Sequence, residues 1–165
     1  LINNAGTLGP VGPAGLQQAD AIAAALNLNV TAAMVFTGHF LHATRGLTAN
    51  RRILHISSGA GRNPVSGWSV YCASKAALDM HARAVKAEQG QQGARIVSLA
   101  PGVVDTAMQE QIRATPAEDF PSLPRFQTLH AEGQLAAPAD VAGRILTYLE
   151  RDDFGATDVD DIRHY

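Results

Sequence analysis

The sequence predicts an α/β fold in which helices cover both faces of a parallel sheet. Short apolar runs, such as residues 51–58 and 94–102, alternate along the chain with helical patterns of more than ten residues. This alternation is typical of βαβ units, whose successive strands run parallel. Polar or glycine-containing turns directly follow three predicted strands, at residues 3–6, 57–59 and 101–102. Ligands bind at this carboxyl edge of such sheets, so the turns predict where a functional site would lie.

The first part of the chain predicts the end of a strand, a loop and a long helix. The first two residues are apolar, like the end of a buried strand, and residues 5–18 are rich in glycine and proline, which interrupt regular structure. Asp20 suits the N-cap of a helix that runs to about Thr48. This helix is apolar on nearly all sides between residues 21 and 41, so we expect it to be buried between the sheet and another surface.

A second strand and a second helix follow. The run RRILHISS, residues 51–58, predicts a short buried strand, and residues 59–67 contain the glycine and proline of a loop. The alanine-rich segment from about Ser69 to Gln89 predicts a helix, because alanine is the strongest helix former.

The remainder predicts one buried strand, an irregular segment, a helix and a final strand. ARIVSLAPG, residues 94–102, is an apolar strand with its exit turn, and residues 105–136 are interrupted by proline, which favours short helices joined by loops. Pro138 suits the first turn of a helix that ends near Arg151. The run ATDVDDI, residues 156–162, is a possible last strand.

The composition indicates one domain and excludes several classes of partner. The 165 residues are 46% hydrophobic and carry a formal net charge of −2, which suits a single domain, residues 1–165, with an ordinary core. A charge this small, without a basic stripe, argues against nucleic acid and anionic membranes as partners. The longest apolar stretch, residues 21–36, contains two asparagines and a threonine, so we expect it to be too short and too polar to span a bilayer.

Cysteine and histidine usage indicates neither a disulfide framework nor a metal site. Cys72 is the only cysteine, which excludes an internal disulfide and favours a reducing, cytoplasmic compartment. The six histidines do not form metal-binding spacings, and the nearest pair, His39 and His42, is interpreted as part of a helix face. We therefore expect no metal.

Tyr71 and Lys75 stand four residues apart in the predicted helix of residues 69–89. This spacing places both side chains on one helix face, with Cβ atoms about 5–6 Å apart. A free tyrosine titrates near pH 10, and a nearby ammonium favours the phenolate, so we expect Lys75 to lower the pKa of Tyr71 toward neutrality. Alone, the pair is also compatible with a half-buried tyrosine beside a solvent-facing lysine.

The order of the motifs resembles the short-chain dehydrogenase/reductase family. Its matches here are the turn Asn3-Asn4-Ala5-Gly6 after a strand, Asn29 in the long helix, Ser58 after the next strand, Tyr71 and Lys75 thirteen and seventeen residues later, the turn Pro101-Gly102, and Thr106. The likeness extends from Leu1 to about Leu149. The segments PGVVDTAMQEQIRAT and FQTLHAEGQL, with the acidic end, resemble the branch of sepiapterin reductase and benzil reductase. The resemblance implies a Rossmann-like, doubly wound parallel sheet.

The resemblance implies an oxidoreductase that transfers hydride from a nicotinamide cofactor to the carbonyl of a small ketone or dicarbonyl. Tyr71 would give or take the proton at the carbonyl oxygen, and Ser58 would hold that oxygen. Lys75 would also bind the nicotinamide ribose. Asn29 would interrupt its helix and hold a water that connects Lys75 to solvent. Asn27 is the rival by composition, but the pattern of asparagine, two residues and a small residue fits Asn29.

The resemblance also assigns cofactor contacts to two turns. Asn3, Ala5 and Gly6 would support the central strands beside the adenine ribose. Pro101, Gly102, the Val104 backbone and Thr106 would contact the nicotinamide, and the missing Cβ of Gly102 would allow close approach. Ordinary turn chemistry is the alternative for both turns.

A substrate-binding lobe is expected at residues 105–136, because this segment directly follows the turn at the carboxyl end of the sheet. Trp68 and Met108 would form part of an apolar pocket wall, which suits an aromatic ketone or dicarbonyl better than a sugar. Packing of the lobe onto the core is the alternative, and we favour it for Ile112 and Leu123. For the C-terminal carboxylates of Asp158, Asp160 and Asp161 we favour solvation over substrate binding.

The family's glycine-rich first half has no counterpart in this sequence, so the sheet is expected to be incomplete and the chain to be the catalytic C-terminal part. Residues that choose between NAD and NADP normally lie in that half; NADPH is favoured because the closer branch uses it. The alternative function is a non-catalytic remnant that keeps the fold for self-association. The two long helices, 20–48 and 69–89, predict a homodimer or homotetramer.

Overall fold

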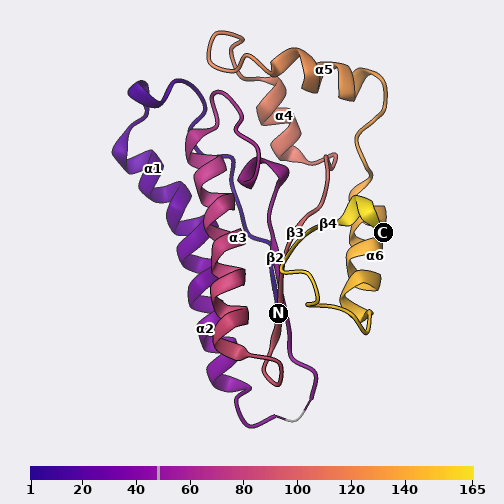
Figure 1. Cartoon of the computed structure of the whole chain (residues 1–165). Helices are drawn as coiled ribbons and strands as arrows, with labels where there is room; N and C mark the ends of the chain where they lie inside the picture. Colours follow the sequence, from indigo (N-terminus) through magenta and orange to yellow (C-terminus); the bar gives the residue numbers. More distant parts are fainter. Residues whose placement is uncertain (48) are drawn as a thin grey trace.

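The computed structural model describes residues 1–47 and 49–165 and contains a sheet of four parallel strands. The strands lie in the sheet in chain order: β1 (Ile2–Asn3), β2 (Arg52–Ile56), β3 (Arg95–Ala100) and β4 (Val159–Asp161). In the register, Leu54 pairs with Ile2 on one side and with Val97 on the other. Helices connect successive strands (Figure 1), so the predicted α/β class is confirmed.

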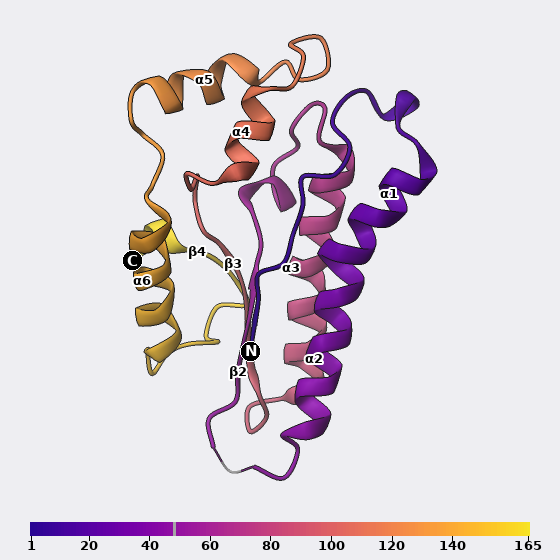
Figure 2. The same cartoon turned by 180° about the vertical axis from the view of Figure 1, so that it is seen from behind.

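Helices cover both faces of the sheet, as expected of a doubly wound fold (Figures 1 and 2). One face carries α1 (Ala19–Leu26), α2 (Ala32–Ala43) and α3 (Ser69–Gln89), and the other carries α6 (Pro138–Glu150). Two short helices, α4 (Ala107–Arg113) and α5 (Leu123–Ala131), lie beyond the carboxyl ends of the strands. Short 3-10 turns are η1 (Ala14–Leu16), η3 (Gly59–Gly61) and η4 (Ile162–His164).

The core lies on both sides of the sheet because consecutive strand residues point to opposite faces. In β2, Ile53 packs in a cluster with Ala82 of α3, whereas Leu54 packs in a cluster with Tyr148 of α6. Both strand residues are fully buried. A continuous apolar run of this kind is typical of parallel strands that are covered on both faces.

The lobe of residues 105–136 is closed at its base by backbone pairing. Val104 forms an isolated parallel bridge with Ala136, and the Asp105 N–H donates to the Ala136 carbonyl at 2.9 Å. The Ala136 N–H donates to the Val103 carbonyl at 2.9 Å. The lobe therefore starts and ends at one point, directly after the turn that follows β3.

The long N-terminal helix is shorter than predicted and is interrupted near its middle. It begins at Ala19 and ends at Ala43, where the sequence predicted an end near Thr48, a residue outside the described ones. A π-helical turn, η2 (Asn27–Thr31), separates α1 from α2. This insertion is centred on Asn29, where an interruption was expected.

Only one side of this helix is covered within the chain, so its expected burial against a further surface stays a prediction. The buried residues on its inner side are spaced four apart: Ala25, Asn29, Ala33 and Thr37. By length and composition the helix from Ala19 to Ala43 would suffice to cross a membrane, so the argument from a short apolar stretch is wrong. One such helix is weak evidence for a membrane span, because core helices of soluble proteins pass the same test.

Candidate active site

The three predicted turns follow β1, β2 and β3 and meet at the carboxyl edge of the sheet. Gly6 shows this convergence directly. A Cβ added at Gly6 would lie 3.6 Å from Asn29 Oδ1 and 3.6 Å from Lys75 Nζ. The first turn, the long helix and α3 therefore come together at one place, as the order of motifs predicted.

Tyr71 and Lys75 are both buried on the inner face of α3, with 8% and 5% of their surfaces exposed. Lys75 Nζ lies 5.6 Å from the centroid of the Tyr71 ring and donates a hydrogen bond of 2.8 Å to the Ile56 carbonyl at the end of β2. The turn η3 packs against this part of α3. Gly61 of η3 allows the close packing, because a Cβ there would lie 2.9 Å from the Lys75 carbonyl carbon. The pair is thus part of the core and not a solvent-facing helix surface.

The pKa of Tyr71 shifts in the direction opposite to the one predicted. Burial raises the pKa of Tyr71, and the side-chain hydrogen bond with Ser58 acts against this by lowering it. Lys75 is itself buried, which lowers its pKa to about 8, while Asp79 acts to raise it. Burial disfavours the charged form of both groups and is the largest cause of both shifts. Tyr71 is therefore a neutral phenol at physiological pH, the form that donates a proton.

Ser58 lies at the exit of β2, next to η3. Its Oγ accepts a hydrogen bond of 3.2 Å from the Ala60 N–H and so caps the short turn. This bond fixes the Ser58 side chain close to Tyr71, where the two groups interact. Ser58 is therefore held beside Tyr71, and its side chain interacts with the Tyr71 hydroxyl.

Asn29 is fully buried, and its amide holds the chain that follows β1. Its Oδ1 accepts a hydrogen bond of 2.8 Å from the Thr7 N–H, and its Nδ2 donates to the Thr7 carbonyl at 2.8 Å and to Ser74 Oγ at 3.1 Å. Asn27 is exposed, and its Oδ1 accepts a hydrogen bond of 3.4 Å from Thr31 Oγ1. The geometry supports the choice of Asn29, and its role in holding a water stays a prediction.

The Asn3 side chain is engaged inside the domain, and a cofactor contact of this turn stays a prediction. Its Nδ2 lies 3.1 Å from Thr37 Oγ1 and 3.0 Å from His55 Nδ1. His55 Nε2 lies in turn 3.0 Å from His81 Nδ1, so a polar chain runs between the sheet and the helices. The side chain of Asn3 thus supports the end of β1.

We expect the free energy of unfolding to fall as the pH drops below 6.5, because the fold keeps His55 neutral. Burial lowers the pKa of His55 to about 3, and burial also lowers the pKa of His81. The unfolded chain therefore binds more protons in this range, which costs about 1–3 kcal/mol for His55 by about pH 4.5. Urea unfolding at about pH 7.5 and about pH 4.5 measures the loss. Between these two pH values, the His55→Gln variant should lose less of its free energy of unfolding than the parent protein does. An equal loss would contradict the neutral state of His55.

The other predicted cofactor residues surround the carboxyl edge. Ala5 and Gly6 are exposed, and Pro101, Gly102 and Val104 are half-buried. Thr106 precedes α4, and its hydroxyl makes no capping bond there. Gly102 has a φ of +78°, which favours glycine, and a Cβ there would lie 3.5 Å from Arg163 Cδ. The C-terminal turn therefore packs against this edge, which the sequence did not predict.

Trp68 belongs mainly to the core of the lobe. It is 6% exposed and stacks on Phe120, with ring centroids 4.8 Å apart and planes at 5°. It also meets Tyr71 edge to face at 5.5 Å. Ile112 and Leu123 are buried in the same cluster, as favoured from the sequence, and Met108 packs against it. Trp68 is thus a support behind Tyr71, and Met108 is the better candidate for a pocket wall.

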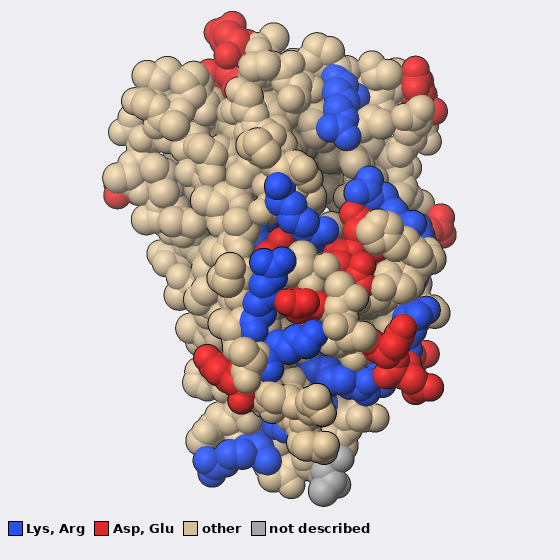
Figure 3. Space-filling view, in the orientation of Figure 1, with Lys and Arg blue, Asp and Glu red and all other residues tan. Residues whose placement is uncertain are grey.

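The C-terminal carboxylates of Asp160 and Asp161 are buried, so their predicted solvation is wrong. Asp160 Oδ2 accepts hydrogen bonds from the hydroxyls of Tyr148 and Tyr165 at 2.9 and 2.7 Å. Asp161 pairs with Arg163 at 2.6 Å, which lowers the pKa of that carboxyl. Among the three carboxylates, Asp158 is the partly exposed one, and it pairs with Arg83 at 3.5 Å. Figure 3 shows cations and carboxylates interleaved on this side of the molecule.

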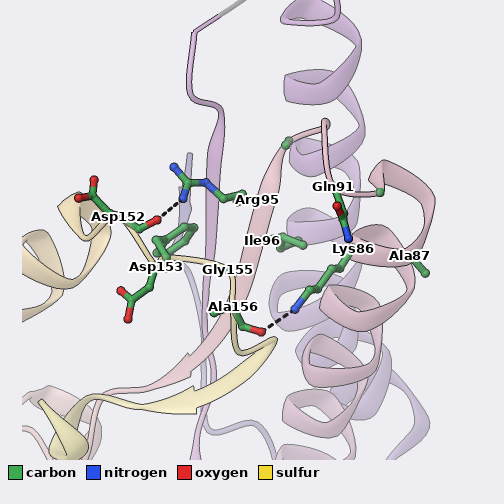
Figure 4. Close-up of a pocket in the computed structure, with 12 residues that line it drawn as sticks. Lys86, Ala87, Gln91, Arg95, Ile96, Asp152, Asp153, Gly155 and Ala156 are labelled. Carbon is green, nitrogen blue, oxygen red and sulfur yellow. Dashed lines mark hydrogen bonds between the residues drawn. The ribbon is translucent and has the colours of Figure 1, made fainter.

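A cavity of about 510 Å³ lies away from these residues, between the end of α3, the start of β3 and residues 152–156 (Figure 4). Lys86 and Arg95 line it, but each donates to a backbone carbonyl, of Ala156 at 3.0 Å and of Asp152 at 2.6 Å. Among residues 1–47 and 49–165, no group of histidine, cysteine or acidic residues has the arrangement of a metal site. The carboxyl edge therefore stays the candidate active site.

Comparison with known proteins relates this chain to a family of enzymes. The family model described as short chain dehydrogenase matches residues 1–117. Over 156 residues the chain is 42% identical to the benzil reductase ((S)-benzoin forming) of Bacillus cereus, a match that covers 93% of this chain and 63% of the relative. It is 38% identical over 159 residues to the sepiapterin reductase of Rattus norvegicus, covering 93% and 59%.

Solved structures agree with this relationship. The KRED1-Pglu enzyme matches with a TM-score of 0.84 and 31% identity, covering 93% of this chain and 65% of that one. A short chain dehydrogenase from Escherichia coli CFT073, solved with NADPH, matches with a TM-score of 0.77 and 28% identity, covering 98% and 61%. The chain thus spans less than two thirds of the length of these relatives.

Proposed function

The chain belongs to the short-chain dehydrogenase family, and from this premise we propose that it serves an enzyme that reduces the carbonyl of a small aromatic ketone or dicarbonyl with NADPH. The observation that carries the proposal is the group formed by the buried Tyr71 and Lys75 and the half-buried Ser58 at the carboxyl edge of the sheet. A proton donor, a hydroxyl that binds oxygen and an ammonium meet there, where such folds bind ligands.

The geometry supports a separate role for each of these three side chains. Hydride addition leaves negative charge on the carbonyl oxygen, which must then receive a proton. Tyr71 is neutral because burial raises its pKa, so its hydroxyl is the proton donor. Ser58 donates a hydrogen bond to the same oxygen and holds it at Tyr71. Lys75 stabilises the phenolate that Tyr71 becomes after it has given up its proton.

The residues at this edge fit a nicotinamide cofactor, which when bound supplies the hydride. Lys75 Nζ has one hydrogen-bond acceptor among the described residues, the Ile56 carbonyl, so two of its protons are available to ribose hydroxyls. The exposed Gly6 and the left-handed Gly102 leave the backbone open to close approach. NADPH in place of NADH is supported by the Escherichia coli relative, whose structure contains NADPH.

The substrate class rests on the names of the relatives and on the apolar lobe. We expect the full-length protein to oxidise NADPH in the presence of benzil-like diketones or pterin-type dicarbonyls, and to act little on simple sugars. A spectrophotometric panel with both cofactors tests this directly. Faster reduction of sugars than of aromatic diketones would overturn the substrate class, and a preference for NADH would overturn the choice of cofactor.

We also expect a homodimer or homotetramer built on the two long helices. Their outer helix patch consists of exposed apolar side chains of η2, α2 and α3: Leu28, Met34, Val35, Phe36 and Met80. Phe36 alone is 61% exposed, and exposed apolar side chains gathered on neighbouring helices support an association surface. A second copy of the same helices offers a matching surface across a two-fold axis.

Phe36→Glu should convert the full-length protein from an oligomer to a monomer, because two carboxylates would be buried in a symmetric apolar interface. Light scattering at micromolar concentration measures the mass. Leu16→Glu is the matched control, since Leu16 is 73% exposed but lies outside the outer helix patch. A parent protein that is already monomeric at this concentration would contradict the proposed assembly.

A further inference from the structure

Asp79 is a buried carboxylate that continues the face of α3 on which Tyr71 and Lys75 lie. The three residues follow one another at intervals of four, so each side chain lies about one turn beyond the previous one. Asp79 is 5% exposed. A carboxylate is rarely buried to this degree unless it is paired and hydrogen-bonded, because its desolvation is costly.

The carboxylate joins three parts of the chain to the helix. Its Oδ1 accepts hydrogen bonds from Ser57 Oγ and from Ser98 Oγ, both at 2.7 Å. Its Oδ2 pairs with Arg62 Nε at 3.2 Å. The same guanidinium donates to the Asp160 carbonyl at 2.9 Å, so the network also reaches β4.

Two of these contacts bear on the candidate active site. Ser57 immediately precedes Ser58, so the bond from Ser57 fixes the exit of β2 against α3. Arg62 directly follows η3, the turn that Ser58 caps, and its bond to Asp79 holds the other end of that turn. Ser58 thus lies in the chain between Ser57 and Arg62, and both of these residues bond to the Asp79 carboxylate.

Lys75 is surrounded by groups whose charges must be considered together. On α3 it faces Tyr71, which is neutral, and Asp79, which is negative. From β2 it faces His55, which is kept neutral by burial and bonded to His81. Arg62 neutralises part of the charge of Asp79 from the outer side. Asp160 contributes its backbone carbonyl to Arg62, and its carboxylate is directed to Tyr148 and Tyr165.

On the basis of the proposed function, we propose that Asp79 is a positioning residue of the active site. It holds the turn that carries Ser58 against the helix, and its charge keeps Lys75 in the ammonium form that stabilises the Tyr71 phenolate. It acts through these residues and does not itself touch the reacting atoms. The pKa of Lys75 supports this role, because Asp79 raises it while burial lowers it.

The test is the titration of Lys75 in the full-length protein, followed by NMR of the ¹³Cε atoms of labelled lysines and assigned with Lys75→Arg. Asp79→Asn keeps the shape of the side chain but removes its charge, so the Lys75 midpoint should fall by about one pH unit. Ser98→Ala removes one hydrogen bond and leaves the charge, so its midpoint should stay within about 0.3 of the parent value. An unchanged midpoint in Asp79→Asn overturns the proposal, even if that variant melts at a lower temperature.

A second variant keeps the test valid if Asp79→Asn does not fold. Arg62→Gln removes the cation that partly neutralises Asp79, and the Arg62 side chain is 30% exposed, so the fold should tolerate it. The Lys75 midpoint should then rise, and a fall would overturn the proposal. The alkaline limit of NADPH-dependent diketone reduction should move with the midpoint in each variant. A shifted midpoint in a parent that reduces no carbonyl supports the electrostatic role of Asp79 and contradicts only the proposed function.

Discussion

Tyr71→Phe should reduce the rate of carbonyl reduction in the full-length protein by about 10²–10⁴-fold, the usual contribution of a positioned proton donor. The hydroxyl is the part of Tyr71 that reacts, whereas its ring is packed edge to face against Trp68 at 5.5 Å. Phenylalanine keeps the ring and removes the hydroxyl, so packing should be preserved. Steady-state NADPH oxidation with a diketone gives the rate, and circular dichroism with thermal unfolding checks the fold.

Tyr165→Phe is the matched control for this loss. It removes a tyrosine hydroxyl that also forms a hydrogen bond, to Asp160 at 2.7 Å, but lies in the C-terminal turn. Its rate should stay within about twofold of the parent. Turnover of Tyr71→Phe in the same range would remove Tyr71 from the mechanism.

Phe120→Ala should lower the free energy of unfolding by about 3–5 kcal/mol, the usual cost of removing a fully buried aromatic ring. Phe120 is fully buried and lies at the centre of the lobe, stacked on Trp68 at 4.8 Å and tilted against Phe126 at 5.5 Å. Neither neighbouring ring can fill the space without leaving its own contacts. Urea unfolding of the full-length protein measures the difference.

Leu146→Ala provides the comparison for a large apolar side chain that is not enclosed. Leu146 is 56% exposed on α6, and alanine is a good helix former, so the loss should be below about 1 kcal/mol. Equal losses in the two variants would show that the lobe unfolds separately from the sheet, in disagreement with the continuous cluster that joins Phe120, Trp68 and Tyr71.

Much of the fold was predictable because the signals are local. Apolar runs such as residues 51–58 predicted buried strands, and the alanine-rich segment predicted α3 with its observed ends, Ser69 and Gln89. Proline at position 138 marked the start of α6. The end of the first helix was predicted too late, although Arg45 and Gly46, residues typical of a helix end, closely follow Ala43.

The identity of the central site residues was also predictable, since Tyr71 and Lys75 are one turn apart on a helix whatever that helix packs against. Asn29 was distinguished from Asn27 by its pattern, and the helix is irregular at that point. Asp79 carried the same signal, an interval of four residues after Lys75, but a carboxylate at that position is equally expected on a solvated face. Only burial among Ser57, Ser98 and Arg62 shows that it belongs to the core.

The sequence thus determined which side chains share a helix face and which turns follow strands, because these relations depend on spacing along one element. Tertiary packing decided the electrostatics: the raised pKa of Tyr71, the neutral His55 and the buried Asp160 and Asp161. It also placed Trp68 in the lobe and Arg163 beside Gly102. Desolvation depends on atoms brought from distant parts of the chain, so spacing within one helix does not reveal it.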